Sequence, residues 1–424
     1  MAKTMSFAVI ALLFLGAASA VLPYAGVAQG TSGTVLYVAL TPSGSGVPGG
    51  SCSAPGFNTV SGAVAYAENN VINGPESRVE VCPGTYAGQV VITKSLDIVG
   101  TSARNPPVIQ APSTPLAPDP LCVTYASSPG CSPAITDIVD ISGPKVSVGM
   151  TDVVVSGPGP GGCWSIEFGI FVYGGASLTL KDSQITKIED TPFSGCQNGV
   201  ALQAGWSTAL GAPVEEVGSA TLVNVNINNY QKNGITVDGA GSMLTMSGST
   251  VTGAGPQATN GQNGVQISEG ANANIRGSTI SGDIWTATAQ QNPGYPSGPN
   301  IETELQSPCV LFYYGGDSTV LRGNTFTACD AGIDAFATNS GPGMSISKNR
   351  FVDPTWYGAI LQDSNMTLTG NRFVGGFYGV AVVADAYGSG TTTTGTLVGN
   401  IFHGQTDGPV LTMALPGYMA TVKY

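Results

Sequence analysis

The sequence predicts an all-β solenoid, in which the chain winds into stacked coils of parallel strands. Residues 331–404 contain three similar units, each with two short alternating strands that are joined by a turn and end in Asn-x-Phe or Asn-Ile-Phe. The asparagines of these units, Asn349, Asn371 and Asn400, are 22 and 29 residues apart. Repeats of this length, built from strands and turns without helices, are typical of solenoids.

The N-terminus has the pattern of a targeting segment. Lys3 precedes an apolar stretch, and small residues follow at a position suited to cleavage. We expect residues 1–20 to be a signal peptide cleaved after Ala20, with Ala28 as the alternative site, and residues 21–34 to be a linker. An uncleaved anchor is the other interpretation, although the apolar stretch is short for a membrane span. No later apolar run approaches the ~20 residues of a membrane span, so none is predicted in the mature chain.

The composition is acidic and poor in charge. The chain has 14 Lys and Arg against 26 Asp and Glu, a net charge of −12, and loss of the signal peptide with its single Lys makes it −13. Such a balance opposes binding to nucleic acid and to anionic membrane surfaces. We therefore predict no nucleic-acid partner.

The cysteines indicate structural disulfides. There are eight in a chain predicted to enter an oxidising space, and no Cys-x-x-Cys pair points to redox chemistry or zinc. Eight cysteines allow 105 pairings, so proximity in sequence is only a guide. On that guide we favour Cys52–Cys82, Cys122–Cys131, Cys163–Cys196 and Cys309–Cys329.

The predicted domain begins with a strand and a helix. Residues 36–38 are the first expected strand. Residues 59–68 form the one convincing helical pattern, since their apolar residues recur at i, i+3, i+4 and i+7, namely Val60, Ala63, Val64 and Ala67. A solenoid needs a cover over its first open coil, so we expect this helix to be the N-terminal cap.

The next stretch resembles a known superfamily. The helix, the turn Val81-Cys82-Pro83-Gly84-Thr85-Tyr86 and the strand Ser95-Leu96-Asp97-Ile98-Val99-Gly100 resemble the N-terminal coils of secreted right-handed parallel β-helix proteins. These form the pectin-lyase-like superfamily, which includes pectinesterases, pectate lyases and polygalacturonases. The resemblance runs from about Tyr37 to the end of the chain. It implies a single right-handed parallel β-helix domain over residues 35–424, with a substrate groove over the first strand of each coil.

About eleven coils follow one another, with a few interruptions. Residues 101–135 are interpreted as a long loop, and residues 205–218 and 285–307 as two insertions that shape a binding surface. At the same turn of successive coils we expect an asparagine ladder and a phenylalanine column. These consist of Asn324, Asn349, Asn371 and Asn400, and of Phe326, Phe351, Phe373 and Phe402.

The outward face of the first strands is the candidate binding surface. We aligned these strands on a glycine, such as Gly199, Gly234 or Gly264, and took the residues two and four positions later as outward-facing. Aromatic, amide and carboxyl side chains at these positions suit neutral sugars, which present apolar ring faces and hydroxyls. The candidate substrate-binding residues are Tyr173, Gln203, Gln266, Tyr313 and Asp334.

Two carboxyls on neighbouring coils are the candidate catalytic pair. Glycoside hydrolysis needs carboxyls about 5 to 9.5 Å apart. Asp238 and Asp334 are three coils apart, or ~14 Å, which is too far. Asp238 and Glu269 lie on adjacent coils and are the first choice, with Asp334 and Asp363 as the second.

The motifs of the named enzyme families are missing. The alignment places no Arg or Lys on the first-strand face, whereas pectate lyases use a basic residue beside acidic calcium ligands. The Asn-Thr-Asp, Asp-Asp and Gly-His-Gly motifs of polygalacturonases do not occur, and the one histidine, His403, is placed on a third strand. No metal site or cofactor is predicted, because no calcium-binding loop of recognisable spacing occurs. Ca²⁺ at an Asp/Glu cluster is left open as an alternative.

These observations predict a secreted or cell-surface protein that binds polysaccharide or a cell-surface glycan along the first-strand face. Whether it also cleaves that polysaccharide, as a lyase or a glycoside hydrolase, is left open. The alternative is a non-catalytic structural or adhesive rod of the cell envelope or extracellular matrix.

Overall fold

The computed structural model describes residues 35–41, 49–70, 77–286, 307–385 and 392–424. The predicted signal peptide, the predicted linker and most of the 285–307 insertion lie outside these residues. Among the helices of the described ranges, none combines the length and the apolar character that crossing a membrane requires.

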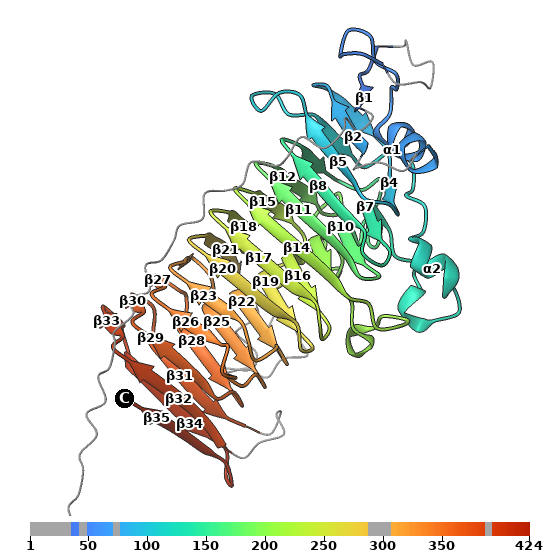
Figure 1. Ribbon diagram of the computed structural model, residues 1–424. Coiled ribbons are helices and arrows are strands. Elements are labelled where there is room, and N and C mark those ends of the chain that lie inside the picture. The colour runs from blue at the N-terminus through green and yellow to red at the C-terminus, as the bar shows by residue number, and fades with distance from the viewer. Residues whose placement is uncertain (1–34, 42–48, 71–76, 287–306, 386–391) are drawn as a thin grey trace, which may run out of the picture.

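The chain forms a rod of stacked coils with three long parallel sheets (Figure 1). Each strand pairs in parallel with the equivalent strands of the neighbouring coils, and the strand at either end of a sheet has one such partner. The predicted right-handed parallel β-helix is confirmed, and the eleven strands of the first sheet match the expected number of coils.

The first sheet contains the strands that open each coil. Its strands in chain order are β4 (Val90–Ile92), β7 (Asp137–Ser142), β10 (Phe168–Tyr173), β13 (Val200–Ala204), β16 (Asn233–Asp238), β19 (Asn263–Ser268), β22 (Pro308–Tyr313), β25 (Ala331–Phe336), β28 (Tyr357–Gln362), β31 (Tyr378–Ala384) and β34 (Gly408–Ala414).

The second sheet is the longest, with thirteen strands. They are β1 (Val35–Val38), β2 (Ser77–Val81), β5 (Leu96–Gly100), β8 (Ser147–Thr151), β11 (Ala176–Lys181), β14 (Gly218–Val223), β17 (Met243–Ser247), β20 (Asn272–Arg276), β23 (Val320–Arg322), β26 (Ser345–Ser347), β29 (Met366–Thr369), β32 (Thr392–Val398) and β35 (Met419–Lys423).

The third sheet closes each coil with a short strand. Its members are β3 (Thr85–Ala87), β6 (Val108–Gln110), β9 (Val154–Ser156), β12 (Gln184–Ile188), β15 (Asn226–Tyr230), β18 (Thr250–Gln257), β21 (Thr279–Trp285), β24 (Thr325–Thr327), β27 (Arg350–Val352), β30 (Arg372–Val374) and β33 (Ile401–His403). His403 is therefore on the third sheet, as predicted.

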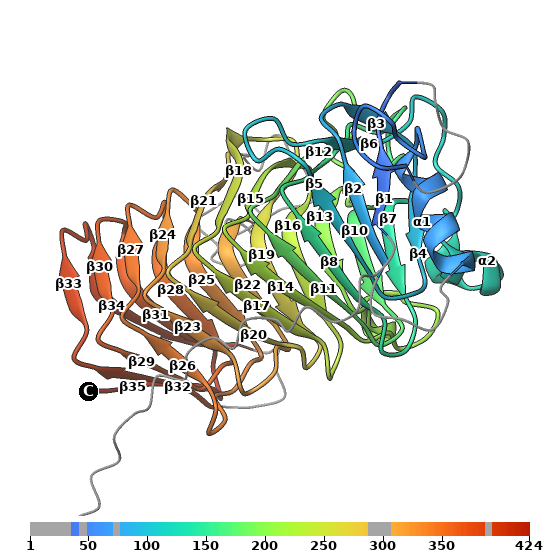
Figure 2. The same ribbon diagram turned by 45° about the horizontal axis from the view of Figure 1, so that its top comes forward.

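Helix α1 (Val60–Asn69) lies at the N-terminal end of the rod (Figure 2). Its N-cap is Thr59, whose hydroxyl accepts a hydrogen bond from the Gly62 N–H at 3.1 Å. The four predicted apolar residues are its buried face, packed into the core of the first coils. The expected capping helix is confirmed.

Residues 101–135 were predicted to be one long loop, but they contain regular secondary structure. They contain strand β6, helix α2 (Pro120–Thr124) and a 3₁₀ turn (Pro129–Cys131). The short α2 escapes pattern recognition because five residues cannot show a helical period. The segment packs on the outer face of the first sheet, where Leu121, Cys122 and Cys131 join an apolar cluster with Phe171.

The four predicted disulfides are confirmed, and they are Cys52–Cys82, Cys122–Cys131, Cys163–Cys196 and Cys309–Cys329. All eight cysteines of the chain are thereby paired.

The asparagine ladder and the phenylalanine column are also confirmed. Each amide Nδ2 donates to the next Oδ1 at 3.1 Å, from Asn324 through Asn349 and Asn371 to Asn400. The phenylalanine rings are 4.5 to 5.1 Å apart between centroids. The asparagines lie at the turn just before the third sheet, and the phenylalanines lie within its strands β24, β27, β30 and β33. Both columns hold successive coils in register.

Asn371→Ala should lower the free energy of unfolding by about 2–4 kcal/mol, because it leaves buried backbone groups without partners. Asn371 accepts from the Asn349 N–H and donates to the Ile346 carbonyl. Urea unfolding followed by circular dichroism measures this. Asn226→Ala, at an exposed position on β15, is the control and should change the midpoint little. Equal effects of the two variants would contradict a stabilising ladder.

Candidate functional site

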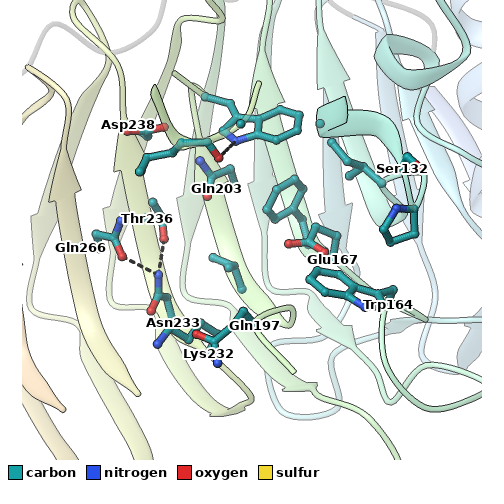
Figure 3. A pocket seen from close by; sticks show the side chains of 18 residues that line it. Ser132, Trp164, Glu167, Gln197, Gln203, Lys232, Asn233, Thr236, Asp238 and Gln266 are labelled. Carbon is teal, nitrogen blue, oxygen red and sulfur yellow. Dashed lines mark hydrogen bonds between the residues drawn. The ribbon is translucent and has the colours of Figure 1, made fainter. Parts of the chain in front are cut away.

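A pocket of about 460 Å³ lies on the outer face of the first sheet, over β10, β13, β16 and β19 (Figure 3). Two covering segments form one wall. The α2 segment, meaning residues 101–135, contributes Ser132, Pro133 and Ile135. The 205–218 insertion contributes Trp206 and Leu210. The pocket is therefore built where the long excursions of the chain meet the sheet.

The register of the first sheet corrects the alignment of one coil. Phe171 pairs with Gln203, and Gln203 pairs with Thr236. The residue equivalent to Gly234 is therefore Ala201 rather than Gly199, a shift of two positions. A shift of two keeps the same face of a strand outward. Gln203 accordingly still faces the pocket, as does Gln266 of β19.

Glu167 and Lys232 enter the pocket from the residues just before β10 and β16. The Gly199 N–H donates to the Glu167 carbonyl at 3.2 Å, and the Lys232 N–H donates to the Gly199 carbonyl at 3.1 Å. The three residues are thus in register on three successive coils. Two strand spacings separate the backbones of Glu167 and Lys232 by about 10 Å. Gly199 places no side chain between them.

These two side chains lie on opposite sides of the pocket. Figure 3 shows Glu167 beside Trp164, and Lys232 beside Gln197 and Asn233. The Lys232 Nζ donates to the Gly261 carbonyl at 2.7 Å. No ion pair joins Glu167 to Lys232 in the described part of the chain, where the two ion pairs are elsewhere.

Burial moves both groups toward neutrality. Desolvation, followed by the nearby Asp190 carboxylate, raises the pKa of Glu167 to about 8. Desolvation lowers the pKa of Lys232 to about 8. A carboxylic acid and an amine that both titrate near pH 8 can donate and accept protons under mild conditions.

Amide side chains form an ordered floor of the pocket. The Asn233 Nδ2 donates to the Thr236 Oγ1 at 2.9 Å and to the Gln266 Oε1 at 3.0 Å. The Asn263 Nδ2 donates to the Asn233 Oδ1 at 2.9 Å. The Gln203 Nε2 donates to the Gly205 carbonyl. Planar groups fixed in this way can present donors and acceptors to a polar ligand.

Aromatic rings supply the apolar part of the lining. Trp206 meets Phe168 and Phe171 edge to face, with both centroid distances at 6.4 Å. Its Nε1 donates to the Leu210 carbonyl at 3.3 Å within the insertion. Trp206 and Phe168 both line the pocket, whereas Phe171 is buried behind them.

Of the predicted catalytic pair, the pocket contains Asp238 and not Glu269. Both Asp238 oxygens are engaged, because Oδ2 accepts from the Ser207 N–H at 2.7 Å and Oδ1 from the Ser268 hydroxyl at 2.8 Å. Burial raises the pKa of Asp238, and these bonds oppose the increase. Glu269 follows β19, and burial, then Asp238, raises its pKa. Asp238 therefore anchors the insertion to β16.

The other predicted binding residues lie apart from the pocket. Tyr173 is buried under the α2 segment, and its hydroxyl contacts Asp140 Oδ2 at 3.0 Å. Tyr313 stacks on Phe336 at 5.4 Å between centroids, further along the first sheet. Asp334 is nearly buried, and burial raises its pKa to about 7.

Glu167 and Lys232 were not among the predicted site residues, and Lys232 corrects the expectation of no basic residue at this face. The prediction counted the alternation of inward and outward side chains forward from the glycine of each first strand. That alternation is interrupted at the glycine position itself. Ala201 and Leu202 are neighbours, and both lie in the interior. The residues just before each strand therefore do not follow the simple alternation. The signal that could have found them is their shared position two residues before the glycines of Phe-Gly-Ile and Asn-Gly-Ile.

Comparison with known proteins agrees with this architecture. The family model described as the right handed beta helix region matches residues 211–402. The search of curated proteins found no match. The A-module of mannuronan C-5 epimerase AlgE4 from Azotobacter vinelandii is 14% identical, covering 86% of this chain and 95% of that chain, with a TM-score of 0.49.

Two further solved structures also match this chain. The alginate lyase from a Paenibacillus species is 12% identical over 86% of this chain and 97% of that chain, with a TM-score of 0.46. The surface protein and adhesin PfbA of Streptococcus pneumoniae is 11% identical over 85% and 94%, with a TM-score of 0.47. At these identities no activity transfers, so the chemistry has to come from the pocket of this chain.

Asp238→Ala should loosen the 205–218 insertion while leaving the sheet intact, because it removes the acceptor of the Ser207 N–H. Hydrogen–deuterium exchange should become at least several-fold faster at Ser207 and its neighbours. Glu269→Ala is the control, since among the described residues the Glu269 side chain is linked to the insertion through the charge of Glu215 and by no hydrogen bond. Unchanged exchange in Asp238→Ala would show that the insertion is held by other contacts.

Proposed function

We propose that this chain binds a polysaccharide in the pocket and transfers protons on one of its sugars with Glu167 and Lys232. The observation that carries the proposal is their placement on either side of Gly199. An acid and a base, both with pKa near 8, face a gap that is lined by aromatic and amide side chains. That combination fits a ligand with apolar ring faces, many hydroxyls and an acidic carbon–hydrogen bond.

The lining supports sugar binding specifically. The indole of Trp206 and the ring of Phe168 offer apolar surfaces for a sugar face. The amides of Gln203 and Gln266 each keep an N–H beyond the one bonded to Gly205 or Ser268, and these can donate to sugar hydroxyls. Asn233 holds Gln266 in place, because its Nδ2 donates to the Gln266 Oε1. Further along the same sheet, the stacked Tyr313 and Phe336 extend this surface beyond the pocket. A polymer lying across the strands would meet both places.

The acid and base favour elimination from a uronate sugar. In its neutral form Lys232 takes the proton from the carbon beside the carboxyl group. The electron pair of that C–H bond forms a C=C bond, and the neighbouring C–O bond to the next sugar breaks. Glu167 in its protonated form gives its proton to the leaving oxygen. The pocket amides can stabilise charge on the uronate carboxylate by hydrogen bonding.

Hydrolysis by two carboxyls fits the geometry less well. Glu167 and Asp238 are the carboxyls of the pocket. Glu167 is in register with Lys232, two coils away, and Asp238 lies six residues further along that coil. The two carboxyl residues are therefore about 20 Å apart along the strand direction. Hydrolytic pairs are about 5 to 9.5 Å apart. The Asp238 oxygens are also engaged by Ser207 and Ser268.

A secreted or surface location accords with the cysteine chemistry. All eight cysteines form disulfides, and disulfides persist in oxidising spaces outside the cytosol. Polysaccharides of walls and matrices are the ligands available there. The low content of charged residues, 9%, is compatible with a rod of this kind.

A glycan array with the purified chain tests binding, and product assays then test turnover. We expect binding to a uronate-containing polysaccharide and ultraviolet absorbance from an unsaturated product. Trp206→Ala should weaken binding at least tenfold. Trp356→Ala is the matched control, since Trp356 stacks on Phe377 away from the pocket. Binding without product would support a binding module, and the absence of both would favour the structural or adhesive rod.

The activity should show a bell-shaped dependence on pH with a maximum near pH 8. The acid limb comes from Lys232, which is protonated below its pKa of about 8 and then cannot accept a proton. The alkaline limb comes from Glu167, which is ionised above its pKa of about 8 and then cannot donate one. Measurement of kcat/KM from pH 6 to pH 10 checks this.

Variants separate the two limbs. Glu167→Gln should lose at least a hundredfold in kcat/KM and should lose the alkaline limb from its residual activity. Lys232→Met should abolish the acid limb together with most of the activity. Lys348→Met, at an exposed turn on a distant coil, is the control. A pH profile that is the same in Glu167→Gln and the wild type would exclude Glu167 as the acid.

A further inference from the structure

Three buried carboxyl groups meet behind the pocket wall. Asp119 comes from the α2 segment, and Asp137 and Asp140 come from the outer face of β7. All three residues have 0% exposure, and one carboxylate oxygen from each lies within 4.8 Å of the others. They belong to the region that anchors the segment and do not line the pocket.

Two oxygens of this cluster lack any partner. Asp119 Oδ2 and Asp137 Oδ2 are buried without a hydrogen bond. The remaining oxygens are occupied. Asp119 Oδ1 accepts from the Leu121 N–H at 2.7 Å and is 3.3 Å from the Tyr173 hydroxyl, and Asp137 Oδ1 is 3.4 Å from the Gln89 Nε2. A buried carboxylate oxygen without a partner is costly and calls for an explanation.

Asp140 completes the set. Its Oδ1 accepts from the Ser142 hydroxyl at 2.9 Å, and its Oδ2 is 3.0 Å from the Tyr173 hydroxyl. No Lys, Arg or His forms an ion pair with any of the three carboxyls in the part of the chain that the structure describes. The cluster thus concentrates negative charge in a buried place without a side-chain cation.

We propose that Asp119, Asp137 and Asp140 bind one Ca²⁺ ion that fastens the α2 segment to β7. An ion about 2.4 Å from each of three oxygens keeps them within about 4.8 Å of one another, which is the spacing found here. Ca²⁺ takes oxygen ligands in flexible geometry and accepts several carboxylates, whereas Mg²⁺ demands a stricter octahedron. The two orphaned oxygens become ligands.

Protons are the alternative way to neutralise the cluster. Without an ion, burial and then the repulsion from Asp119 raise the pKa of Asp137 well above its ordinary value. Burial and then Asp119 raise the pKa of Asp140 to about 8. A shared proton joins two carboxyls of the cluster at a time, whereas an ion coordinates all three at once.

The ion would act on the pocket through the segment that it holds. Ser132, Pro133 and Ile135 of that segment form part of the pocket wall. Asp119 and Ile135 are also joined by a backbone hydrogen bond of 2.9 Å. Calcium would therefore order a wall of the pocket without touching the ligand.

Calorimetric titration of the EDTA-treated, dialysed full chain with CaCl₂ tests the proposal. We expect saturable binding of one Ca²⁺ per chain, weaker binding of Mg²⁺, and a thermal unfolding midpoint that rises with free Ca²⁺. Limited proteolysis within residues 112–134 should slow at least several-fold in Ca²⁺. Absence of saturable binding together with an unchanged midpoint would overturn the proposal.

Variants assign the binding to this cluster. Asp137→Asn should lose the calcium-dependent rise of the midpoint, yet unfold at or above the wild-type midpoint in calcium-free buffer, because it removes buried like charge. Asp140→Asn is the second variant, and Asp407→Asn, an exposed carboxyl on the last coil, is the control that should keep the rise. Unreduced Ca²⁺ binding in both cluster variants would overturn the proposal. No polysaccharide enters this experiment, so its outcome is independent of the function proposed for the pocket.

Discussion

The register between coils is the constraint on which the rest of the structure depends. Each strand pairs only with its equivalents in the neighbouring coils. A side chain therefore acquires neighbours from distant parts of the sequence, from Ala359 opposite Val380 to Leu96 opposite Val148. The asparagine ladder holds this register at one corner through bonds that repeat at 3.1 Å. A slip by one residue would turn every inward side chain outward, which the apolar interior prevents.

Register is also what assembles the pocket. Glu167, Gly199 and Lys232 are separated by more than thirty residues at each step, and backbone hydrogen bonds place them in one row. Burial by the covering segments then shifts the pKa of the acid upward and that of the amine downward, to about 8 in both cases. The insertion held by Asp238 adds Trp206 to the pocket lining. The stacked coils, the covering segments and the two titratable side chains thus together form the pocket.

The fold was predictable from sequence because its signals repeat. Asn349, Asn371 and Asn400 mark equivalent turns, and apolar and polar residues alternate in the strands of each unit. A coil with an ambiguous pattern can therefore be aligned by its neighbours. The site was harder to predict because it depends on departures from the repeat. The alternation breaks at the start of the strands, as between Ala201 and Leu202, so counting from the glycine did not reveal that Lys232 faces the pocket. The α2 segment covers Tyr173, which alternation alone had placed on the outside. Neither effect has a local sequence signal, because both depend on packing between distant segments.

The most direct measurement of the central claim is a crystal structure of Glu167→Gln with a bound uronate oligosaccharide. The substitution slows turnover while preserving the shape of the pocket. We predict a sugar ring over Gly199, between residues 167 and 232, with the carbon beside its carboxyl group within reach of the Lys232 Nζ and a ring or chain contact on Trp206. A bound oligosaccharide that lies on another face of the rod, with the row at Gly199 vacant, would contradict the account.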